Sequence, residues 1–498
     1  MSDEIGIVVG EARPERIKFV AKHPVRVGEY VVVDTDDGPV IYMVEAFKNI
    51  SELLSKENDY KTADEARRAI TRNPRDRVRV ALAKALGLVN ELLNGRRIYP
   101  TLPPEPGASV KPAEDRLLER IYGSEGDRWV DLGCLLRRRN VRAFIDLNMV
   151  ASRHLAILAA TGKGKSNLLA LLAKKISEKH GTMIIFDYHG EYGDLKIPQI
   201  KITTPRINPR NLDVEELADL VGVMRGATRQ RTVLQQVFTR DVRETEDFWG
   251  ALLGRLQAIA EDEDNFDSQT RARARAVAEI VRRALAVWGR VFDPSARSPL
   301  DVVVNNRINI LDISEFTEYQ AQIIVDRYLE EILQDRKNAV RGEGEAKFRS
   351  PVVVAIEEAH VFLPSQRRTK CSEIIARIAR EGRKFGVSLI IISQRPSRLD
   401  ADTVSQMGSF AISGLIHPRD QAFVKEVTDD VSEELGASLP SLNPGEMIFA
   451  GNFIKVPALV KVDLVEEKFI GRDLDAVKLW EDEVKAGSSY STEELIKP

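Results

Sequence analysis

The sequence predicts an α/β protein with a parallel sheet covered by helices on both faces, a β-rich N-terminal region and an inserted helical bundle. Three observations support this fold class. Near-continuous apolar strands alternate with amphipathic helices from about residue 150 onward. Residues 5 to 47 are rich in strand-forming runs, and residues 210 to 295 contain helical stripes but no credible strand.

Size and composition limit the class of protein. At 498 residues the chain exceeds what a single hydrophobic core supports, so we expect more than one domain. The net charge of −3 indicates no overall affinity for polyanions, and the two cysteines give neither a metal-binding spacing nor a disulfide framework. The acidic start lacks a secretory signal, and the apolar runs are too short to span a bilayer. We therefore expect a cytoplasmic protein that does not enter a membrane.

The N-terminal hundred residues contain two types of sequence. The runs "IGIVVGEA", "RIKFVA" and "GEYVVVDTDDGPVIYMVEAF" are typical of strands, and "DTDDG" predicts a hairpin turn. Residues 50 to 95 are charged, and we interpret them as helical. The Pro-rich stretch "TLPPEPGASVKP", residues 101 to 112, predicts a connector.

From about residue 150, apolar segments typical of strands alternate with amphipathic segments typical of helices. The predicted strands are "HLAILAA", "TMIIFDYH", "RINILDIS", "PVVVAIEEA", "VSLIIIS" and "FAISGLI". The predicted helices include "NLLALLAKKISEKH", "YQAQIIVDRYLEEILQDRK" and "SEIIARIAREGRKFG". In the interrupting block, Val277, Val281, Ala284 and Trp288 fall on one helix face. We interpret the surrounding arginines as a solvated face or a subunit contact, not as a nucleic-acid tract.

The stretch "HLAILAATGKGKSNLLALLAKK" predicts a phosphate-binding loop between a strand and a helix. Gly162 and Gly164 allow the tight turn, Lys165 can reach the β- and γ-phosphates, and the Ser166 hydroxyl can bind Mg²⁺. Ala159 stands where the usual motif has its first glycine. A small residue fits there if its φ is negative, so ATP binding with Mg²⁺ is still predicted.

The apolar strand in "PVVVAIEEAHVFL" ends in two carboxylates. Glu357 is predicted to bind Mg²⁺, a role in which Asp is more usual, and Glu358 to act as the base that polarises the attacking water. The alternative is an acidic stretch that caps a helix start. The strand "INILDI" lies between the two motif strands, as in the class of P-loop ATPases that has an additional strand there.

Two further strand ends bear polar side chains. "FDYHGEYGDL" brings Asp187, His189 and Glu191 to the carboxyl end of a strand, where open α/β sheets bind ligands. We interpret His189 as a structural histidine, with a metal ligand or base as the alternative. Gln394 in "VSLIIISQRPS" stands where a γ-phosphate sensor is expected, although a polar strand cap explains it equally well.

Two basic clusters follow the catalytic strand. Arg380 and Arg383 are one helical turn apart, and either could reach a neighbouring subunit's γ-phosphate or simply solvate a helix end. Arg367, Arg368 and Lys370 are concentrated in "PSQRRTKCS". In a ring this loop could face the pore and contact DNA phosphates.

Together with the β-rich start, several motifs resemble the HerA family, archaeal hexameric DNA translocases and helicases that are similar to FtsK-type pumps. In chain order they are "ATGKGKS", "FDYHGEY", "VVVAIEEAHVFLP" and "IAREGRKFGVSLIIISQRPS". The resemblance covers essentially the whole chain. It implies an N-terminal HAS barrel, a RecA-like P-loop ATPase core with a helical insertion, and a C-terminal brace. It also implies a homohexamer around double-stranded DNA and a NurA-like nuclease partner in DNA end resection.

The resemblance also implies residue roles and domain boundaries. Lys165 and Ser166 correspond to the Walker A pair, Glu358 to the catalytic glutamate, Gln394 to the sensor and Arg383 to an arginine finger that acts in trans. Arg142 is a weaker candidate for a second trans contact. The expected nucleotide-binding residues are Thr161, Gly162, Lys163, Gly164, Lys165, Ser166, Asn167 and Arg142, and the expected metal-binding residues are Ser166, Glu357 and Asp187. The predicted domains are the barrel with a helical extension (1–100), the connector (101–145), the ATPase core (146–209 and 296–465), the helical bundle (210–295) and the brace (466–498).

Other functions stay open at this point. A protein-remodelling ring ATPase also places a small β-barrel ahead of its core, although "GRKFG" and "SQRPS" fit DNA pumps better. A conjugation-type DNA pump is a further alternative. The intact Lys165 and Glu358 argue against a non-catalytic, nucleotide-gated scaffold.

Overall fold

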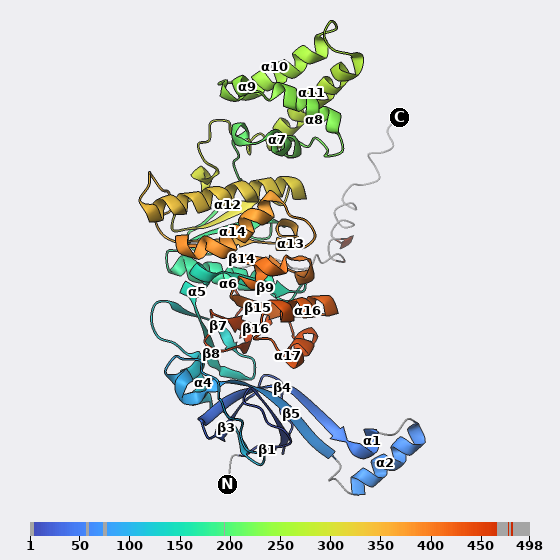
Figure 1. The fold of residues 1–498 in the computed structure, drawn as a ribbon, viewed down its shortest axis with the longest axis vertical. Helices are drawn as coiled ribbons and strands as arrows, with labels where there is room; N and C mark the ends of the chain where they lie inside the picture. The colour runs from blue at the N-terminus through green and yellow to red at the C-terminus, as the bar shows by residue number, and fades with distance from the viewer. Residues whose placement is uncertain are drawn as a thin grey trace, which may run out of the picture.

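The computed structural model describes residues 4–55, 59–72, 77–193, 195–465, 477 and 480–481. In Figure 1 the molecule is elongated: a β-barrel lies at one end, a helical bundle at the other, and a large sheet with its helices between them. Among the described residues, no helix is both long enough and apolar enough to cross a membrane. The predicted C-terminal brace, 466–498, lies outside the described residues except for positions 477, 480 and 481.

The N-terminal barrel closes through six strands in the order β1-β2-β5-β4-β3-β6. Alternate side chains fill its interior, among them Val31, Val33 and Val110, because successive residues of a strand point to opposite faces. The strands are β1 (Gly6–Val8), β2 (Arg16–Ala21), β3 (Tyr30–Thr35), β4 (Gly38–Ser51), β5 (Arg77–Leu88) and β6 (Ser109–Pro112).

The helical interpretation of residues 50 to 95 is wrong for β5, a long strand paired with both β2 and β4. Ala81, Ala83 and Ala85 are fully buried on one face, while Leu82 and Lys84 lie on the other. Alanine and lysine favour helices, but this period of two and the pairing on both edges override that preference. The helices in this stretch are α1 (Glu52–Ser55) and α2 (Tyr60–Arg72), at the tip of an arm formed by β4 and β5, and α3 (Val89–Leu93) (Figure 1).

The stretch predicted as a connector, residues 101–145, contains regular structure. β6 completes the barrel, α4 (Asp115–Tyr122) follows, and β7 (Trp129–Leu135) pairs with β8 (Arg138–Asp146) at the edge of the large sheet. The strand β7 pairs in turn with a strand more than three hundred residues further along the chain, at Val460 and Leu135. A local sequence pattern does not reveal such a pairing.

The large sheet has eleven strands in the order β11-β12-β10-β13-β14-β9-β15-β16-β17-β7-β8. The first seven are parallel: β11 (Ile200–Thr203), β12 (Ile308–Asp312), β10 (Thr182–Asp187), β13 (Val352–Ile356), β14 (Val387–Ser393), β9 (Leu155–Ala159) and β15 (Ser409–Ser413). All six predicted strands are confirmed. The antiparallel extension through β16 (Glu446–Gly451) and β17 (Ala458–Val462) was not predicted.

Helices cover this sheet, and α12 and α14 pack against each other along it (Figure 1). The three predicted helices are confirmed as α6 (Lys165–Glu178), α12 (Glu318–Arg341) and α14 (Lys370–Phe385). Glycine in the left-handed region ends both α12, at Gly342, and α14, at Gly386. The shorter helices of the core are α5 (Leu147–Arg153), α13 (Ala359–Phe362), α15 (Ala401–Ser405), α16 (Pro418–Val427) and α17 (Glu433–Ser438).

The insertion is a helical bundle, as predicted, and projects beyond the sheet (Figure 1). Val277, Val281 and Ala284 are buried along one face of its longest helix, while Arg282 and Arg283 are exposed. The bundle consists of α7 (Val214–Val221), α8 (Thr228–Val237), α9 (Arg240–Glu244), α10 (Phe248–Glu261) and α11 (Ser268–Trp288).

Candidate nucleotide-binding site

Four neighbouring parallel strands end at the same edge of the sheet, in the order β10-β13-β14-β9. The chain segments that follow them are the turn after Asp187, the pair Glu357 and Glu358, Gln394, and the phosphate-binding loop. The tertiary structure therefore brings together motifs that are separated by up to 233 residues in the sequence. This is the edge at which open α/β sheets bind ligands.

The phosphate-binding loop has the backbone shape that the motif predicts. Gly162 and Gly164 have φ values of 73° and 101°, and Gly164 is the N-cap of α6. A Cβ atom on Gly164 would also approach the backbone of Gly445 to 3.3 Å, a tight contact, so the positive φ and the limited space both favour glycine here. Ala159 is the buried last residue of β9 and is not among the residues with positive φ, as the substitution requires. The loop can cradle phosphates with its backbone N–H groups.

Lys165 and Ser166 contact groups of their own chain. The Lys165 Nζ donates a hydrogen bond to the Ala160 carbonyl at 3.2 Å. Burial lowers the pKa of Lys165, against the opposing pull of Glu358, Glu357 and Glu191. The Ser166 hydroxyl donates to the Glu191 Oε2 at 3.1 Å. A half-buried ammonium group and a hydroxyl beside a carboxylate fit a phosphate with its bound Mg²⁺.

Glu358 is held in an unusual conformation between two histidines. Its backbone lies in the left-handed region, with φ 44° and ψ 45°, where side chains with a Cβ are strained. The His360 Nδ1 lies 3.1 Å from its Oε2, and the His189 Nε2 lies 3.3 Å from its Oε1. Burial opposes ionisation, but these histidines and Lys165 lower the pKa of the carboxyl below its ordinary value. Glu358 is therefore a buried carboxyl group whose ionised form is favoured by its neighbours.

Glu357 lies in a different environment from its neighbour. It is 5% exposed, and its Oε1 accepts a hydrogen bond of 2.7 Å from the Tyr192 hydroxyl. Its Oε2 has no hydrogen-bond partner among the described residues. Burial, together with Asp187, Glu191 and Glu358, raises the pKa of Glu357 to about 8. A buried oxygen without a hydrogen-bond partner is available to a ligand. A Mg²⁺ ion that binds together with the nucleotide would be such a ligand.

Asp187 is predicted to bind metal, but both of its carboxylate oxygens accept hydrogen bonds from the backbone of the turn that follows β10. Its Oδ1 accepts from the Glu191 N–H at 3.0 Å and its Oδ2 from the Tyr192 N–H at 2.9 Å. Within the described parts of the chain, no group of three or more His, Cys, Asp and Glu side chains could hold a metal ion. Mg²⁺ bound with a nucleotide usually takes only one or two carboxylates from the protein.

Gln394 lies beside the phosphate-binding loop, and its Oε1 accepts a hydrogen bond from the Thr161 hydroxyl. The two predicted residues thus meet across the ends of β14 and β9. The sequence placed Glu191 at this ligand-binding edge without assigning it a role, and it did not single out Tyr192, although both belong to the recognised motif "FDYHGEY". Their contacts with α6 and with Glu357 after β13 depend on the order of strands in the sheet, which the sequence did not disclose.

Three predicted nucleotide-binding side chains point elsewhere. The Lys163 Nζ donates to the Leu442 carbonyl at 2.5 Å. Asn167 binds the backbone of the segment after β17, with its Nδ2 2.8 Å from the Asp463 carbonyl oxygen. Arg142 is held by Asp131, at 2.7 Å, and by Asp463. In this conformation Lys163 can contribute to phosphate binding only through its backbone, and the Arg142 guanidinium is paired with carboxylates of its own chain.

The predicted DNA-binding and finger residues fall into two groups. Lys370 is engaged, because its Nζ lies 2.6 Å from the Asp213 Oδ2 and 2.8 Å from the Glu216 Oε1, both on the helical bundle. Arg368, Arg380 and Arg383 are exposed and have no ion pair or hydrogen bond among the described residues. Arg367 lies over the Tyr319 ring at 5.7 Å. A hollow of about 600 Å³ is lined by residues that include Arg367, Arg368 and Arg380.

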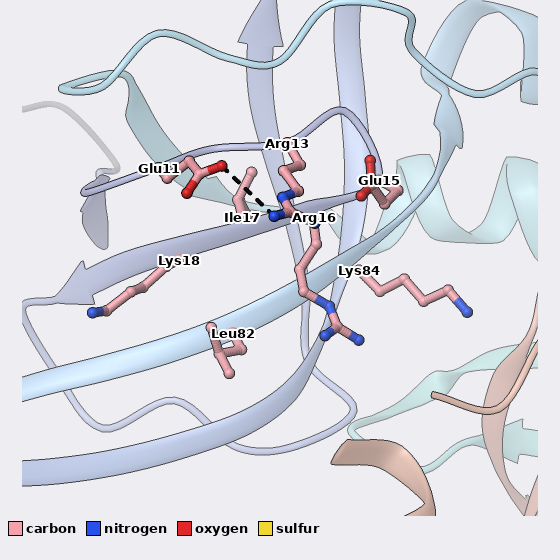
Figure 2. Close-up of a pocket in the computed structure, with 8 residues that line it drawn as sticks. All are labelled: Glu11, Arg13, Glu15, Arg16, Ile17, Lys18, Leu82 and Lys84. Carbon is pink, nitrogen blue, oxygen red and sulfur yellow. Dashed lines mark ion pairs between the residues drawn. The ribbon is translucent and has the colours of Figure 1, made fainter. Parts of the chain in front are cut away.

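A second hollow, of about 360 Å³, lies on the barrel beside its contact with the core. Figure 2 shows Arg16 and Lys84 directed away from the ion pair between Glu11 and Arg13. Arg16 binds the Glu434 carboxylate with two hydrogen bonds of 3.1 and 2.8 Å, and the Lys84 Nζ donates to the Asp429 carbonyl at 3.1 Å. These charged side chains attach the barrel to α17 and to the segment before it.

Comparison with protein families matches two regions of the chain. A family model described as "Helicase HerA, central domain" matches residues 130–332, and one described as "HAS barrel domain" matches residues 5–93. The first region includes the phosphate-binding loop and the turn after β10, and the second includes five of the six barrel strands.

Curated relatives match over nearly the whole length. The "DNA double-strand break repair helicase HerA" of Sulfurisphaera tokodaii is 34% identical, and the alignment covers 96% of each chain. The protein of the same name from Saccharolobus solfataricus is 32% identical over 96% of this chain and 95% of its own. A probable helicase of Methanocaldococcus jannaschii is 34% identical over 96% of this chain and 94% of its own.

Proposed function

Because the chain belongs to the HerA family of helicases, an ATP-hydrolysing class, we propose that it is an ATP-driven translocase and helicase that acts on double-stranded DNA. The observation that supports this most directly is the convergence of the phosphate-binding loop, Glu358 and Gln394 at one edge of the sheet. Several relatives are named as helicases of DNA double-strand break repair, which supports a role in DNA end resection.

We assign the nucleotide site as follows. The backbone of residues 161 to 166 receives the phosphates of ATP, and Lys165 neutralises their charge. Ser166 and Glu357 are the protein groups that would hold Mg²⁺, while Asp187 shapes the turn beside them. Bound Mg²⁺ supplies charge neutralisation at the phosphates and orients them. Gln394, hydrogen-bonded to Thr161 at the mouth of the loop, is assigned as the γ-phosphate sensor.

Hydrolysis requires a group that takes a proton from the attacking water. We assign this role to Glu358, whose lowered pKa keeps it ionised at neutral pH. The carboxylate accepts the proton while the water oxygen forms its bond to the γ-phosphorus, and the bond to the β,γ-bridging oxygen breaks. Burial excludes bulk water from the carboxylate, which strengthens its electrostatic interaction with the reacting groups.

The assembled form we propose is a homohexamer around duplex DNA, with a NurA-like nuclease as partner. Arg383 is the proposed trans-acting finger and Arg380 the second candidate, since both are exposed and unpaired in the described chain. Arg367 and Arg368 are the proposed contacts to DNA phosphates. We also retain the predicted division into barrel, core, bundle and brace as a proposal, with the barrel extended to include β6.

The proposed activity is tested by Glu358→Gln. This variant should bind ATP normally but hydrolyse it about 10²- to 10⁴-fold more slowly, because the base is lost while the phosphate cradle is intact. Steady-state ATPase rates with and without duplex DNA, together with calorimetric ATP binding, measure both effects. Near-normal turnover by Glu358→Gln would contradict the assignment of the base.

The matched control is Lys165→Ala, which should weaken nucleotide binding itself. An unfolded protein substrate in place of DNA separates the translocase from a protein-remodelling ATPase. Stimulation by unfolded protein but not by duplex DNA would overturn the proposed substrate.

A further inference from the structure

The turn that follows β10 is held in one shape by Asp187. This carboxylate is 1% exposed, and its two oxygens accept the backbone N–H groups of Glu191 and Tyr192. Gly190 has a φ of 71°, which lets the chain reverse within these few residues. The directions of the side chains at positions 189, 191 and 192 are therefore set by the buried end of a strand.

Each of these three side chains contacts a different part of the candidate site. The Glu191 Oε2 accepts from the Ser166 hydroxyl of α6 at 3.1 Å. The Tyr192 hydroxyl donates to the Glu357 Oε1 at 2.7 Å, and the His189 Nε2 lies 3.3 Å from the Glu358 Oε1. A single turn thus connects the loop that would receive the phosphates with both glutamates.

We infer that Tyr192 is a positioning residue for Glu357, through which this turn sets the orientation of the site's acidic groups. The inference rests on the proposed function and assigns a further residue to it. The contact between Tyr192 and Glu357 is the most constrained of the three, because the Tyr192 side chain is fully buried and Glu357 is 5% exposed. Burial of both groups limits access of bulk water to this hydrogen bond, and the Glu357 carboxyl group has no other hydrogen-bond partner among the described residues.

The hydrogen bond leaves one oxygen of Glu357 available. The Tyr192 hydroxyl occupies the Oε1, and the Oε2, which lacks a hydrogen-bond partner in the described chain, is the atom that can face Mg²⁺. Without the hydroxyl the carboxyl group can rotate about its last bond, so neither oxygen is held in place. Groups that orient a metal ligand in this way typically contribute about 10- to 100-fold in affinity or activity.

The test is Tyr192→Phe, which removes one oxygen and keeps the ring. We expect the ATPase kcat to fall about 10- to 100-fold while the KM for ATP changes little. We also expect calorimetric titration with a non-hydrolysable ATP analogue to show a smaller gain in affinity on adding Mg²⁺ than in the unmodified protein. Wild-type values for both quantities would overturn the inference.

The matched control is Tyr328→Phe. Tyr328 is also fully buried, and its hydroxyl accepts one hydrogen bond, from the Arg206 N–H at 2.9 Å, but it lies on α12 and contacts none of the assigned site residues. Both substitutions remove one buried hydroxyl, so their melting temperatures should fall by similar amounts. Only Tyr192→Phe should change the response to Mg²⁺. Equal changes in both variants would assign Tyr192 a structural role alone and overturn the inference.

A double-mutant cycle with Glu357→Gln isolates the pair. If Tyr192 acts through Glu357, adding Tyr192→Phe to Glu357→Gln should have little further effect on the Mg²⁺-dependent gain in affinity. Additive losses would show that Tyr192 acts by another route. If the unmodified protein shows no ATPase activity that duplex DNA stimulates, the proposed function fails. If that activity is present but Tyr192→Phe behaves as wild type, only this inference fails.

Discussion

At the scale of single residues, Glu358 combines three properties that rarely occur together. It is buried, it lies within ion-pair distance of two histidines, and its backbone is in the left-handed region. Strain of this kind costs on the order of 1 kcal/mol or more and persists only where the surrounding structure imposes it. At this position it directs the carboxylate of a strand end back toward Lys165, whose pKa the carboxylate acts to raise against the effect of burial.

This strain predicts an unusual order of stability between two substitutions. Glu358→Gly and Glu358→Ala both remove the carboxylate and its contacts with the two histidines, so they differ mainly in the backbone. We expect Glu358→Gly to be the more stable by about 0.5 to 1 kcal/mol, because glycine relieves the left-handed strain by more than its greater freedom in the unfolded chain costs. The midpoint of denaturant unfolding measures the difference.

The control pair is Glu373→Gly and Glu373→Ala, at an exposed position in the first turn of α14. There the order should reverse, because glycine within a helix is about 1 kcal/mol less favourable than alanine. The same order at both positions would show that the backbone at Glu358 is not strained.

At the scale of elements, the helical bundle is attached to the core at the start of α14. Asp213 and Glu216 form a capping box at the N-terminus of α7, and Lys370, the first residue of α14, contacts both. Arg327 of α12 also pairs with Glu216. Against the effect of burial, the hydrogen bonds to Asp213 and Glu216 raise the pKa of Lys370. The bundle and the basic loop before α14 are therefore held by one network.

This network changes the expected contribution of the basic loop to DNA binding. Arg367→Ala and Arg368→Ala should each flatten the slope of log K against log salt, by about 1 for each DNA phosphate that the arginine neutralises. Lys370→Ala should leave the slope nearly unchanged and lower the melting temperature instead, since it leaves Glu216 with one basic partner fewer. Binding of fluorescent duplex DNA at several salt concentrations measures the slopes. A slope that changes only with Lys370→Ala would transfer the phosphate-binding role to that residue.

At the scale of the whole molecule, the segment of residues 429 to 442 contacts both the barrel and the phosphate-binding loop. Its first part binds Arg16 and Lys84 of the barrel, through Glu434 and Asp429. Its last part binds Lys163, through the Leu442 carbonyl. The nucleotide site that we propose takes its loop, its base and its sensor from one chain, whereas Arg383 is exposed on α14 without a described partner. In a ring, an exposed arginine of this kind is available to contact the γ-phosphate bound in a neighbouring subunit.

The ring is tested by mixing two inactive variants. Lys165→Ala keeps Arg383 but loses its own phosphate-binding loop, and Arg383→Ala keeps its loop but loses the finger. Neither homohexamer should hydrolyse ATP well, since fingers of this type are worth on the order of 10³ to 10⁵ in rate. Mixed rings should recover part of the ATPase activity, because some interfaces then pair an intact loop with an intact finger.

The complementation requires proof of subunit exchange, for example by energy transfer between labelled subunits. Mixed rings that stay as inactive as their parents would show that Arg383 acts within its own chain, or that turnover needs every site intact. Rings in which wild-type subunits are diluted with one variant at a time distinguish these two outcomes.

Much of this protein was determined by the sequence alone. Local periodicities and turn residues, which act over a few positions, predict three features. These are the alternation of strands and helices from residue 150 onward, the inserted bundle and the phosphate-binding loop. The tertiary structure decided which side chains meet. Strand pairing orders the sheet as β10-β13-β14-β9, which is not the order of the chain, and so brings Tyr192 to Glu357 and His189 to Glu358. The tertiary structure also makes β5 a strand, although several of its residues favour helices. Pairing with a neighbouring strand on both edges outweighs the preference of single residues.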